Sequence, residues 1–500
     1  MKKTKITHIL LIIFGIILIL IPAFHTNIWF DESYTIAITN KSFSEIWQIT
    51  GHDVHPALYY WMIHIIYLIF GSNILIYRLF SILGVSLLGI LGYTHIRKDF
   101  GEKTGILFSF FTFFLPIMST YGQEIRMYSW SCLIVTLMAI YGYRFYKSLK
   151  NKEEKNSIKN MCLFGIFSIM SCYIHYYALV TAGIINLIIL IYLIKTHKEN
   201  KKALRNFLIL AVIQIILYIP WLIYFIAQLK HVGGGYWIQI GLISTTVDVI
   251  SFQFKSQFTN YFEFNIQTII ALISSLAIYI YIGIKLYKYT KQKENTMPVL
   301  LSILIYISVI AVVGIVSIKS PILYARYLMV MTGLYIFILA YTISKEKNKI
   351  IIGIILGITF ILAISSCIQN SIINYDKSNK EVYNYINEEI KPDDILIYSN
   401  VENGGVTAAT FQNNKQYFMN LDKWDVKEAY KAYLPAMETV ENFDFLKEYK
   451  GRIWVIDDGD MSLYNKEEFV KDNIEIIKEA KKFNVKYHNY TYNIILLEKN

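Results

Sequence analysis

Long apolar runs dominate this sequence and constrain its fold more than any other feature. The runs at 6–24, 207–227, 266–284 and 350–367 contain almost no charged residue. About 20 consecutive apolar residues span a bilayer as a helix. Only 17% of the residues are charged, whereas an ordinary soluble domain has about 25%. The sequence therefore predicts a polytopic membrane protein and excludes a soluble enzyme, a disordered chain and a disulfide scaffold.

Eleven apolar segments are predicted to cross the membrane as helices. The predicted spans are residues 6–24, 74–96, 104–121, 128–146, 160–175, 177–194, 206–227, 265–284, 298–318, 327–343 and 350–368. Segment 57–70 is also apolar, but at about 14 residues it is shorter than the roughly 17 that a span needs. It is expected to lie in the outer interface, as is the amphipathic stretch 33–49. Residues 25–73 then form one large first outer loop.

The distribution of basic residues predicts the orientation in the cell membrane. Basic clusters follow every second span, at residues 2–5, 97–103, 144–159, 195–205, 285–293 and 345–349. Lys and Arg are enriched in cytoplasmic loops, so the N-terminus is predicted to be cytoplasmic. An odd number of spans then places residues 370–500 outside. Orientation by loop charge also accounts for the net charge of +11, so no nucleic-acid partner is predicted.

Residues 370–500 differ in charge from the rest of the chain. They contain 17 Lys and Arg against 23 Asp and Glu, which leaves 31 against 14 in residues 1–369. Their predicted elements are helices at 377–390 and 466–480, short buried strands at 395–398 and 453–456, and a final strand pair at 485–492 and 493–498. The predicted architecture is an all-α membrane domain, residues 1–369, followed by a small extracytoplasmic α/β domain, residues 370–500.

The first candidate functional residues are Asp31 and Glu32, which follow the first span directly. Carboxylates beside a bilayer are costly to desolvate and are usually functional. An alternative is that Asp31 caps an interfacial helix beginning near Ser33, since Asp is a favoured N-cap residue.

The turn His52-Asp53-Val54-His55-Pro56 lies in the same loop. It is either a polar turn shaped by proline, or a set of groups, chiefly Asp53 and His55, that bind an acceptor or a metal. No helical pair of ligands supports a divalent metal, and no Cys/His zinc spacing occurs. We therefore predict no metal and no other cofactor.

A third polar cluster, residues 121–128, ends the third span and contains Glu124, Arg126 and Tyr128. Glu124 and Arg126 could form a structural ion pair. Arg is also the preferred bidentate partner of phosphate. Arg78 and Arg326 are predicted at the same depth, so these arginines could hold a lipid phosphate. By contrast, His175, at the turn between two spans, is interpreted as a core histidine with satisfied hydrogen bonds.

Three of these motifs together resemble a known family. They are Asp31-Glu32, the run DVHPALYY at 53–60 and the run QEIRMY at 123–128. In order and spacing they are similar to the protein O-mannosyltransferases and aminoarabinose transferases, membrane glycosyltransferases of the GT-C fold whose bacterial members are called glycosyltransferase family 39-like. Arg326-Tyr327 resembles a weaker feature, an Arg-Tyr pair opening a late span. The family usually has His-Pro-Pro where this chain has His55-Pro56-Ala57.

The resemblance implies an inverting glycosyltransferase that moves a sugar from a polyprenyl-phosphate carrier to an acceptor on the outer face. It implies Asp31 as the base that takes the acceptor's proton, with Glu32 assisting. Arg126, followed by Arg326 and Arg78, would stabilise the leaving phosphate. Membrane lipids would surround the spans, and the sequence does not identify the acceptor, whether protein, glycan, lipid or wall polymer.

Two alternatives come from other classes of protein. An O-antigen polymerase or ligase also uses a lipid-linked donor, but such proteins usually carry a large late outer loop with arginines. A transporter or flippase tends to show internal repeats and ionisable residues at the membrane midplane. Here the polar residues concentrate in the first outer loop and at the ends of spans, which favours the transferase.

Overall fold

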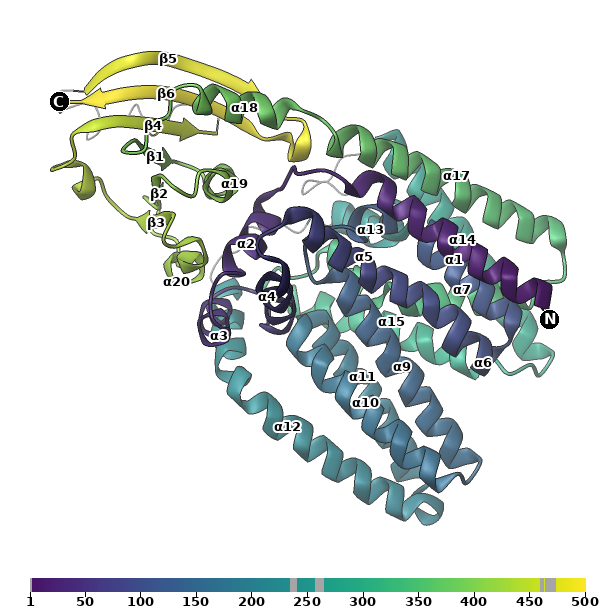
Figure 1. The fold of residues 1–500 in the computed structure, drawn as a ribbon. Helices are drawn as coiled ribbons and strands as arrows, with labels where there is room; N and C mark the ends of the chain where they lie inside the picture. The colour runs from purple at the N-terminus through teal and green to yellow at the C-terminus, as the bar shows by residue number, and fades with distance from the viewer. Residues whose placement is uncertain (1, 234–240, 257–264, 459–462, 464–473) are drawn as a thin grey trace. The chain divides into compact units, whose positions relative to one another are not determined.

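The computed structural model describes residues 2–233, 241–256, 265–458, 463 and 474–500. They form a mostly helical protein with a small C-terminal β-sheet, as the sequence predicts (Figure 1). The chain divides into two compact units. The helical unit comprises Met1–Phe24, His55–Tyr59 and Arg78–Asn370, and the loop–sheet unit comprises His25–Val54, Tyr60–Tyr77 and Ser371–Asn500. The first outer loop, predicted within the membrane domain, thus groups largely with the C-terminal residues.

Every predicted span coincides with helix in the described residues. The helices are α1 (Lys2–Leu20), α5 (Ile74–Leu91), α6 (Arg97–Phe100), α7 (Glu102–Phe114), α8 (Pro116–Tyr121), α9 (Tyr128–Lys150), α10 (Glu154–Ile174), α11 (Tyr176–Lys195), α12 (His197–Gly233), α13 (Leu242–Ser251), α14 (Ile266–Lys291), α15 (Met297–Val316), η4 (Ala325–Met331), α16 (Thr332–Ser344) and α17 (Lys349–Asn374). Short helical turns η1 (Ile21–Ala23), η2 (Gly92–Ile96) and η3 (Phe252–Phe254) extend α1, α5 and α13.

The predicted span 104–121 is broken into α7 and α8. Leu115 is extended, with φ −66° and ψ 129°, and Pro116 opens α8. Proline has no N–H to continue the helix, and it disfavours helical backbone in the residue before it. The break allows α8 to lead into the 121–128 turn, where the candidate residues Glu124 and Arg126 lie.

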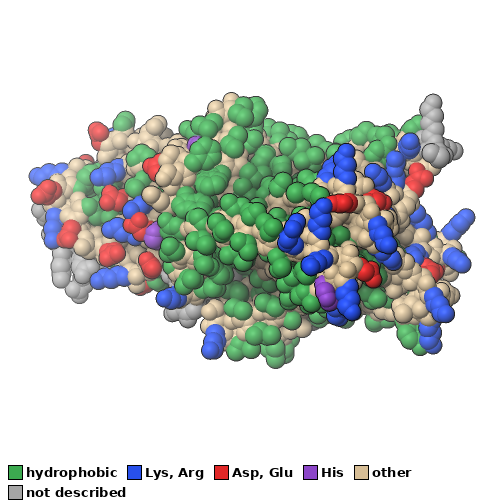
Figure 2. Space-filling model, turned by 90° about the horizontal axis from the view of Figure 1, so that it is seen from below, with side chains coloured by type: hydrophobic (Ala, Val, Ile, Leu, Met, Phe, Trp, Pro, Cys, Tyr) green, Lys and Arg blue, Asp and Glu red, His purple; other side chains and the backbone are tan. Residues whose placement is uncertain are grey.

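Nine helices within the described residues are long and apolar enough to cross a membrane. The predicted spans 104–121 and 128–146 are helical but are not among the nine. The first is broken at Pro116, and the second buries polar residues such as Ser129, Ser131 and Thr136. Figure 2 shows hydrophobic side chains over the sides of the helices and Lys and Arg gathered beyond them. Isoleucines such as Ile223, 74% exposed, would be costly in water, so the chain is a multi-pass membrane protein.

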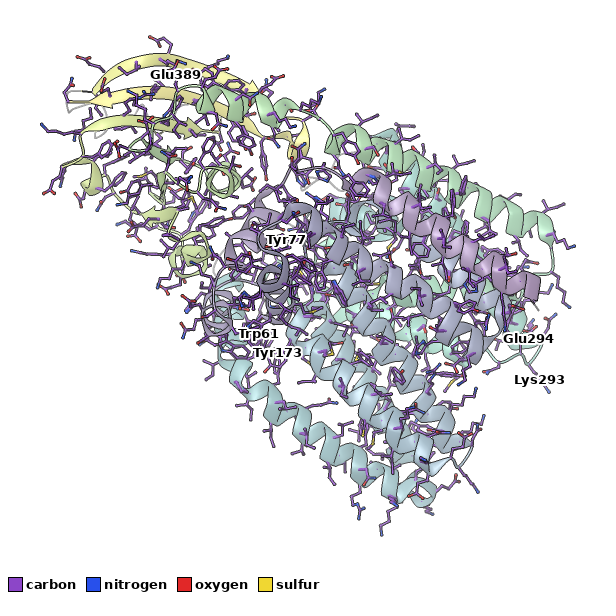
Figure 3. The ribbon with its side chains drawn as sticks, in the orientation of Figure 1. Trp61, Tyr77, Tyr173, Lys293, Glu294 and Glu389 are labelled. Atoms are coloured by element: carbon purple, nitrogen blue, oxygen red, sulfur yellow. The ribbon has the colours of Figure 1, made fainter. Side chains whose placement is uncertain are left out.

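Ion pairs join the helix-end loops of this unit. Lys345, which follows α16, donates to Glu294 at 2.6 Å. Glu294 lies in the loop between α14 and α15 (Figure 3). Arg144 of α9 donates to Asp99 of α6 at 2.7 Å. These pairs involve the basic clusters that the charge pattern assigns to one side of the membrane.

The first outer loop contains three helices, α2 (Phe30–Ile38), α3 (Phe43–Gly51) and α4 (Leu58–Phe70). The predicted single stretch 33–49 is two helices because a turn follows Ile38, and Ser42 then caps α3 by accepting from the Glu45 N–H. α4 has 13 residues and is too short to qualify as a span, as the sequence predicts.

The C-terminal residues form a six-stranded sheet of order β3-β2-β1-β4-β6-β5. Strands β3, β2, β1 and β4 run parallel, and β6 pairs antiparallel with both β4 and β5. The strands are β1 (Ile395–Tyr398), β2 (Lys415–Met419), β3 (Met437–Val440), β4 (Gly451–Asp457), β5 (Ile474–Asn484) and β6 (Thr491–Lys499). Helices α18 (Ser378–Asn387), α19 (Val401–Thr410) and α20 (Lys427–Tyr430) and the turns η5 (Lys431–Tyr433), η6 (Asp444–Leu446) and η7 (Tyr487–Asn489) connect them. The predicted α/β domain is confirmed.

Two predicted elements of this domain are wrong. Residues 474–480, predicted as part of a helix at 466–480, belong to the edge strand β5; residues 466–473 lie outside the described residues. Glu, Lys and Ala favour helix in this segment, but pairing with β6 overrides local propensity. Residues 485–490, predicted as strand, form the turn between β5 and β6, so the final pair is β5 and β6.

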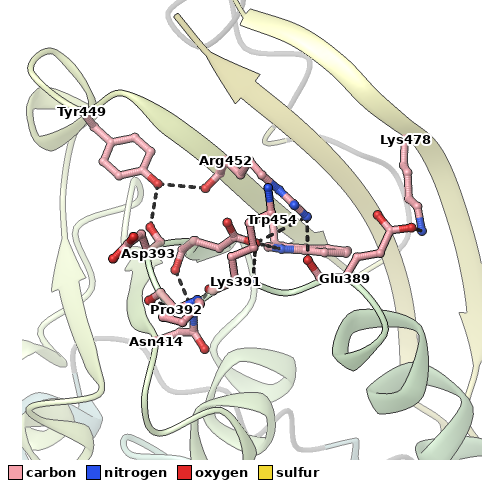
Figure 4. A network of polar contacts seen from close by, with 10 residues as sticks. Glu389, Lys391, Pro392, Asp393, Asn414, Tyr449, Arg452, Trp454 and Lys478 are labelled. Atoms are coloured by element: carbon pink, nitrogen blue, oxygen red, sulfur yellow. Dashed lines mark hydrogen bonds and ion pairs between the residues drawn. The ribbon is translucent and has the colours of Figure 1, made fainter.

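A buried carboxylate anchors the start of β1 to β4. Asp394 accepts a hydrogen bond from the Trp454 indole at 2.9 Å and lies 3.5 Å from the Arg452 guanidinium. Figure 4 shows the side chains of Trp454 and Arg452, both on β4. The Tyr449 hydroxyl donates to the Asp393 carbonyl at 3.1 Å. Inner residues of both strands, such as Leu396 and Val455, are 0% exposed, as in a parallel sheet covered on both faces. The domain therefore has a core of its own.

Candidate active site

The turn between α8 and α9 presents the predicted residues of the third motif. The Arg126 N–H donates to the Glu124 carbonyl at 2.7 Å, which closes the turn. Arg78 of α5 lies beside it, with its guanidinium 3.5 Å from the Gln123 carbonyl. Glu124, Arg126 and Tyr128 are all buried. Burying charged side chains is costly, so their retention at one turn points to a binding function.

Arg326, in η4, belongs to the same helical unit. Its guanidinium carbon lies 5.0 Å from the centre of the Tyr324 ring and 5.8 Å from that of Tyr327, and the side chain is buried. The Tyr177 hydroxyl of α11 donates to the Ile322 carbonyl at 2.8 Å and accepts from the Tyr324 N–H at 3.2 Å. These bonds join the segment before η4 to α11.

Two buried histidines lie beside these groups. The His55 and His175 ring centres are 5.4 Å apart, and the Tyr327 ring lies 5.9 Å from the first and 5.0 Å from the second. Burial lowers the pKa of His55 well below its ordinary value, and the positive charges of Arg126 and Arg326 lower it further. The same causes lower the pKa of His175 to about 3. Both rings are therefore neutral near neutral pH.

The helical unit thus brings together the predicted residues His55, Arg126, Tyr128 and Arg326 and adds His175 and Tyr327. We call these six residues the histidine–arginine cluster. His175 was interpreted from the sequence as a satisfied core histidine; it is buried, but only one ring nitrogen has a hydrogen-bond partner among the described residues. The sequence signal for a functional role of His175 is its position between two apolar spans, where a polar side chain lies at the ends of two helices. Two guanidinium groups with neutral donors around them suit an anion with several oxygens.

The loop–sheet unit contains the predicted carboxylates. Asp31 lies in the first turn of α2, whose N-cap residue is Trp29, so Asp31 does not have the N-cap position considered from the sequence. Glu32 is fully buried and accepts from the Tyr487 hydroxyl at 3.3 Å. The Tyr60 hydroxyl is 3.5 Å from Asp53.

The charges of several carboxylates of this unit act on the hydroxyl of Tyr430. Burial raises the pKa of the Tyr430 hydroxyl, and three nearby carboxylates, those of Asp53, Glu402 and Asp31, raise it further. Glu402 lies in the first turn of α19 and was not predicted as a site residue, because it is more than 300 positions from Asp31 in the sequence.

Helix α2, which carries Asp31 and Glu32, is held by the C-terminal domain. The Phe30 N–H donates to the Tyr490 hydroxyl at 3.0 Å, and the Ser33 and Tyr433 hydroxyls are 3.0 Å apart. A Cβ atom added at Gly405 of α19 would lie 2.6 Å from the Tyr433 hydroxyl and 3.0 Å from Ser33 Oγ. A glycine is therefore required for α2 and α19 to pack this closely.

No group of three or more His, Cys, Asp or Glu within the described ranges is arranged to hold a metal ion. In the helical unit, the positive charge comes from the guanidinium groups of Arg126 and Arg326.

The chain is similar to known proteins in part of its sequence and in its fold. Residues 54–224 match the model of the family described as dolichyl-phosphate-mannose-protein mannosyltransferase. No curated protein matches the chain in sequence. The crystal structure of ArnT from Cupriavidus metallidurans bound to undecaprenyl phosphate has a TM-score of 0.64 at 10% identity, over 98% of this chain and 97% of that chain. The apo state of the same protein has a TM-score of 0.53 with the same identity and coverage.

The family match and the shared fold define the class: the chain is an integral-membrane glycosyltransferase of the GT-C fold. More particularly, its fold is that of the aminoarabinose transferase ArnT, and the predicted resemblance is confirmed. The matched residues include His55, Arg78, Glu124, Arg126 and Tyr128, whereas Asp31, Glu32 and Arg326 lie outside them.

Proposed function

We propose that this protein transfers a sugar from a polyprenyl-phosphate carrier to an acceptor on the extracytoplasmic face, with inversion at the anomeric carbon. The buried histidine–arginine cluster carries this proposal, because it lies largely within the matched region and suits a phosphate. The ArnT crystal structure that shares the fold was determined with undecaprenyl phosphate, a carrier of this type.

In the proposed reaction, the Asp31 carboxylate takes the proton of an acceptor hydroxyl. The acceptor oxygen attacks the anomeric carbon, and the bond from that carbon to the phosphate oxygen breaks. The electron pair passes to the phosphate, whose growing negative charge Arg126 and Arg326 stabilise. Attack from the side opposite the leaving group inverts the configuration.

Other predicted residues take supporting roles in this proposal. Glu32 assists Asp31 and Asp53 contacts the acceptor, while His55 lines the phosphate site as a member of the histidine–arginine cluster. Arg78, Glu124 and Tyr128 shape the donor site around Arg126. Because arginine supplies the positive charge, the reaction needs no metal ion, and chelation with EDTA is expected to leave the rate unchanged.

The test is incubation of purified protein with a panel of polyprenyl-phosphate sugars and envelope extract as acceptor. Release of free carrier phosphate together with labelled product supports the proposal, and the productive donor identifies the sugar. Carrier release from none of the panel, by protein with a normal melting temperature, would contradict it. Movement of intact donor across vesicles without bond cleavage would favour a flippase instead.

The proposed orientation has its own test. In a variant without the four native cysteines, Asn442→Cys in the C-terminal domain should react with impermeant thiol reagents on intact cells. Asn151→Cys, in the loop between α9 and α10, should react only after permeabilisation. Both positions are exposed, so accessibility of the side chain does not limit the labelling. The reverse pattern would place the proposed site in the cytoplasm.

A further inference from the structure

The imidazole of His175 has a binding capacity that the proposed reaction does not use. His175 is the N-cap residue of α11, is extended at φ −164° and ψ 143°, and is 2% exposed. Its Nδ1 atom accepts a hydrogen bond from the Tyr177 N–H at 3.1 Å. Nε2 is buried and has no hydrogen-bond partner among the described residues.

The bond at Nδ1 determines the position of the ring proton. A backbone N–H can only donate, so Nδ1 must carry a lone pair, and the proton of the neutral ring is on Nε2. Burial and the charge of Arg126 lower the pKa of His175 to about 3, so the ring stays neutral over the working pH range. The Nε2–H group is therefore a buried hydrogen-bond donor, and no acceptor for it lies within the described part of the protein.

The surroundings of His175 favour an anionic ligand. Arg126 and Arg326 are near enough for their charges to act on the ring. The Tyr128 ring centre lies 6.1 Å away, and its buried hydroxyl also has no partner among the described residues. A buried donor without an acceptor is costly, and a bound oxyanion would remove that cost.

We propose that His175 is a donor-binding residue whose Nε2–H donates a hydrogen bond to an oxygen of the carrier phosphate. The inference rests on the proposed function, which assigns phosphate binding to the arginines, and adds a neutral donor to them. A neutral donor stabilises the leaving phosphate without placing a third positive charge beside Arg126 and Arg326. The proton stays on Nε2 throughout, and His175 acts by hydrogen bonding alone.

The experiment separates this role from helix capping. His175→Asn keeps an acceptor for the Tyr177 N–H, since Asn is a favoured N-cap residue, but has no group at the position of Nε2. His175→Gln can place an amide N–H near that position. The probe is undecaprenyl phosphate, added to purified wild-type protein, both His175 variants and Arg126→Ala, with binding and melting temperature measured for each.

We expect His175→Asn to bind undecaprenyl phosphate about ten to a hundred times more weakly than wild type, and His175→Gln to recover much of the loss. If wild type binds, Arg126→Ala does not and His175→Asn binds normally, His175 is only a cap and this inference is wrong. If wild type does not bind the carrier, the proposed function fails as well.

A variant that is less stable than wild type can still be tested by the rise in melting temperature that undecaprenyl phosphate causes. This rise compares the same variant with and without the carrier. A rise in His175→Asn as large as in wild type would contradict the inference. A smaller rise in His175→Asn, recovered in His175→Gln, would support it.

Discussion

The candidate residues of the helical unit and of the loop–sheet unit differ in the sign of their charge. In the helical unit, Arg126 and Arg326 are 3% and 4% exposed and lie beside two neutral histidines. In the loop–sheet unit, the negative charges of three carboxylates help to raise the pKa of the Tyr430 hydroxyl. The first arrangement suits a phosphate, and the second suits a hydroxyl that must lose a proton.

The two units also differ in how far the family model covers them. The family match, residues 54–224, lies mostly in the helical unit, and it omits Asp31, Glu32 and all of the C-terminal sheet. In the proposed reaction, every sugar donor carries the same kind of phosphate, whereas the acceptors can differ in chemistry. We therefore expect substitutions in the helical unit to change donor kinetics and substitutions in the loop–sheet unit to change acceptor kinetics.

The largest effect is expected from Asp31→Asn. Asn keeps the size of the side chain but cannot accept the acceptor's proton, and general-base assistance is typically worth about 10²–10⁴-fold. Single-turnover transfer by matched purified proteins should fall by at least about a hundredfold, with carrier binding unchanged. The control is Asp444→Asn, an exposed carboxylate of the same unit that pairs with Lys447. Near-normal turnover by Asp31→Asn would remove the assigned base and make Glu124 or His55 the next candidate.

Arg126→Ala should act on the donor side. Hydrogen bonds to charged groups are worth about 1.5–3 kcal/mol, so the KM for the lipid donor should rise by roughly tenfold to over a hundredfold. The matched control is Arg144→Ala, on α9, whose partner is Asp99. Donor kinetics equal to wild type in a folded Arg126→Ala protein would favour a structural ion pair with Glu124 and move phosphate binding to Arg326.

The contact of α2 with the C-terminal domain predicts a smaller loss. In Gly405→Ala, the new methyl would meet the Tyr433 hydroxyl and Ser33, and such overpacking typically costs about 1–3 kcal/mol. The turnover number should fall by about tenfold through displacement of Asp31, with the donor KM unchanged.

The neighbouring glycine is the control for this prediction. In Gly404→Ala, the methyl would meet the Tyr398 side chain 2.9 Å away, inside the C-terminal domain and away from α2. It should lower the melting temperature without a selective loss of turnover. Equal kinetic losses in both variants would mean that α2 is not positioned by this contact.

The smallest effect concerns acid stability. The pKa of His175 is lowered from 6.5 to about 3, so between these values the unfolded chain binds a proton that the folded chain does not. Stability must then fall as the pH decreases from about 7 to about 5, with about 2 kcal/mol due to this residue. The melting temperature of His175→Asn should drop less over that range than that of wild type. Equal drops would show that His175 is protonated in the folded protein.

Much of the fold could be predicted because its signals are local. Apolar length predicted the helices, including the pair α10 and α11, and the buried strands β1 and β4 were predicted at their observed positions. Segment 474–480 was mispredicted because Glu, Lys and Ala favour helix, and only pairing with β6 makes it a strand. Pro116 could have predicted the break after α7.

The candidate residues divide in the same way. Sequence motifs identified Asp31, Asp53, His55 and Arg126, because unusual polar residues at the ends of apolar runs are visible without a structure. Glu402 and Gly405 carry no such local mark, and His175, although it lies between two spans, is interpreted from the sequence as a core residue.

By itself, then, the sequence determined that this chain crosses a membrane, where its helices lie and which polar motifs it carries, because each of these depends on residues close together in the chain. Only the tertiary structure decided which residues meet: His175 and Tyr327 with His55, and Tyr490, Tyr433 and Gly405 with the helix of Asp31. Those contacts join positions more than a hundred residues apart. They arise from helix packing and sheet pairing, which no local pattern of side chains specifies.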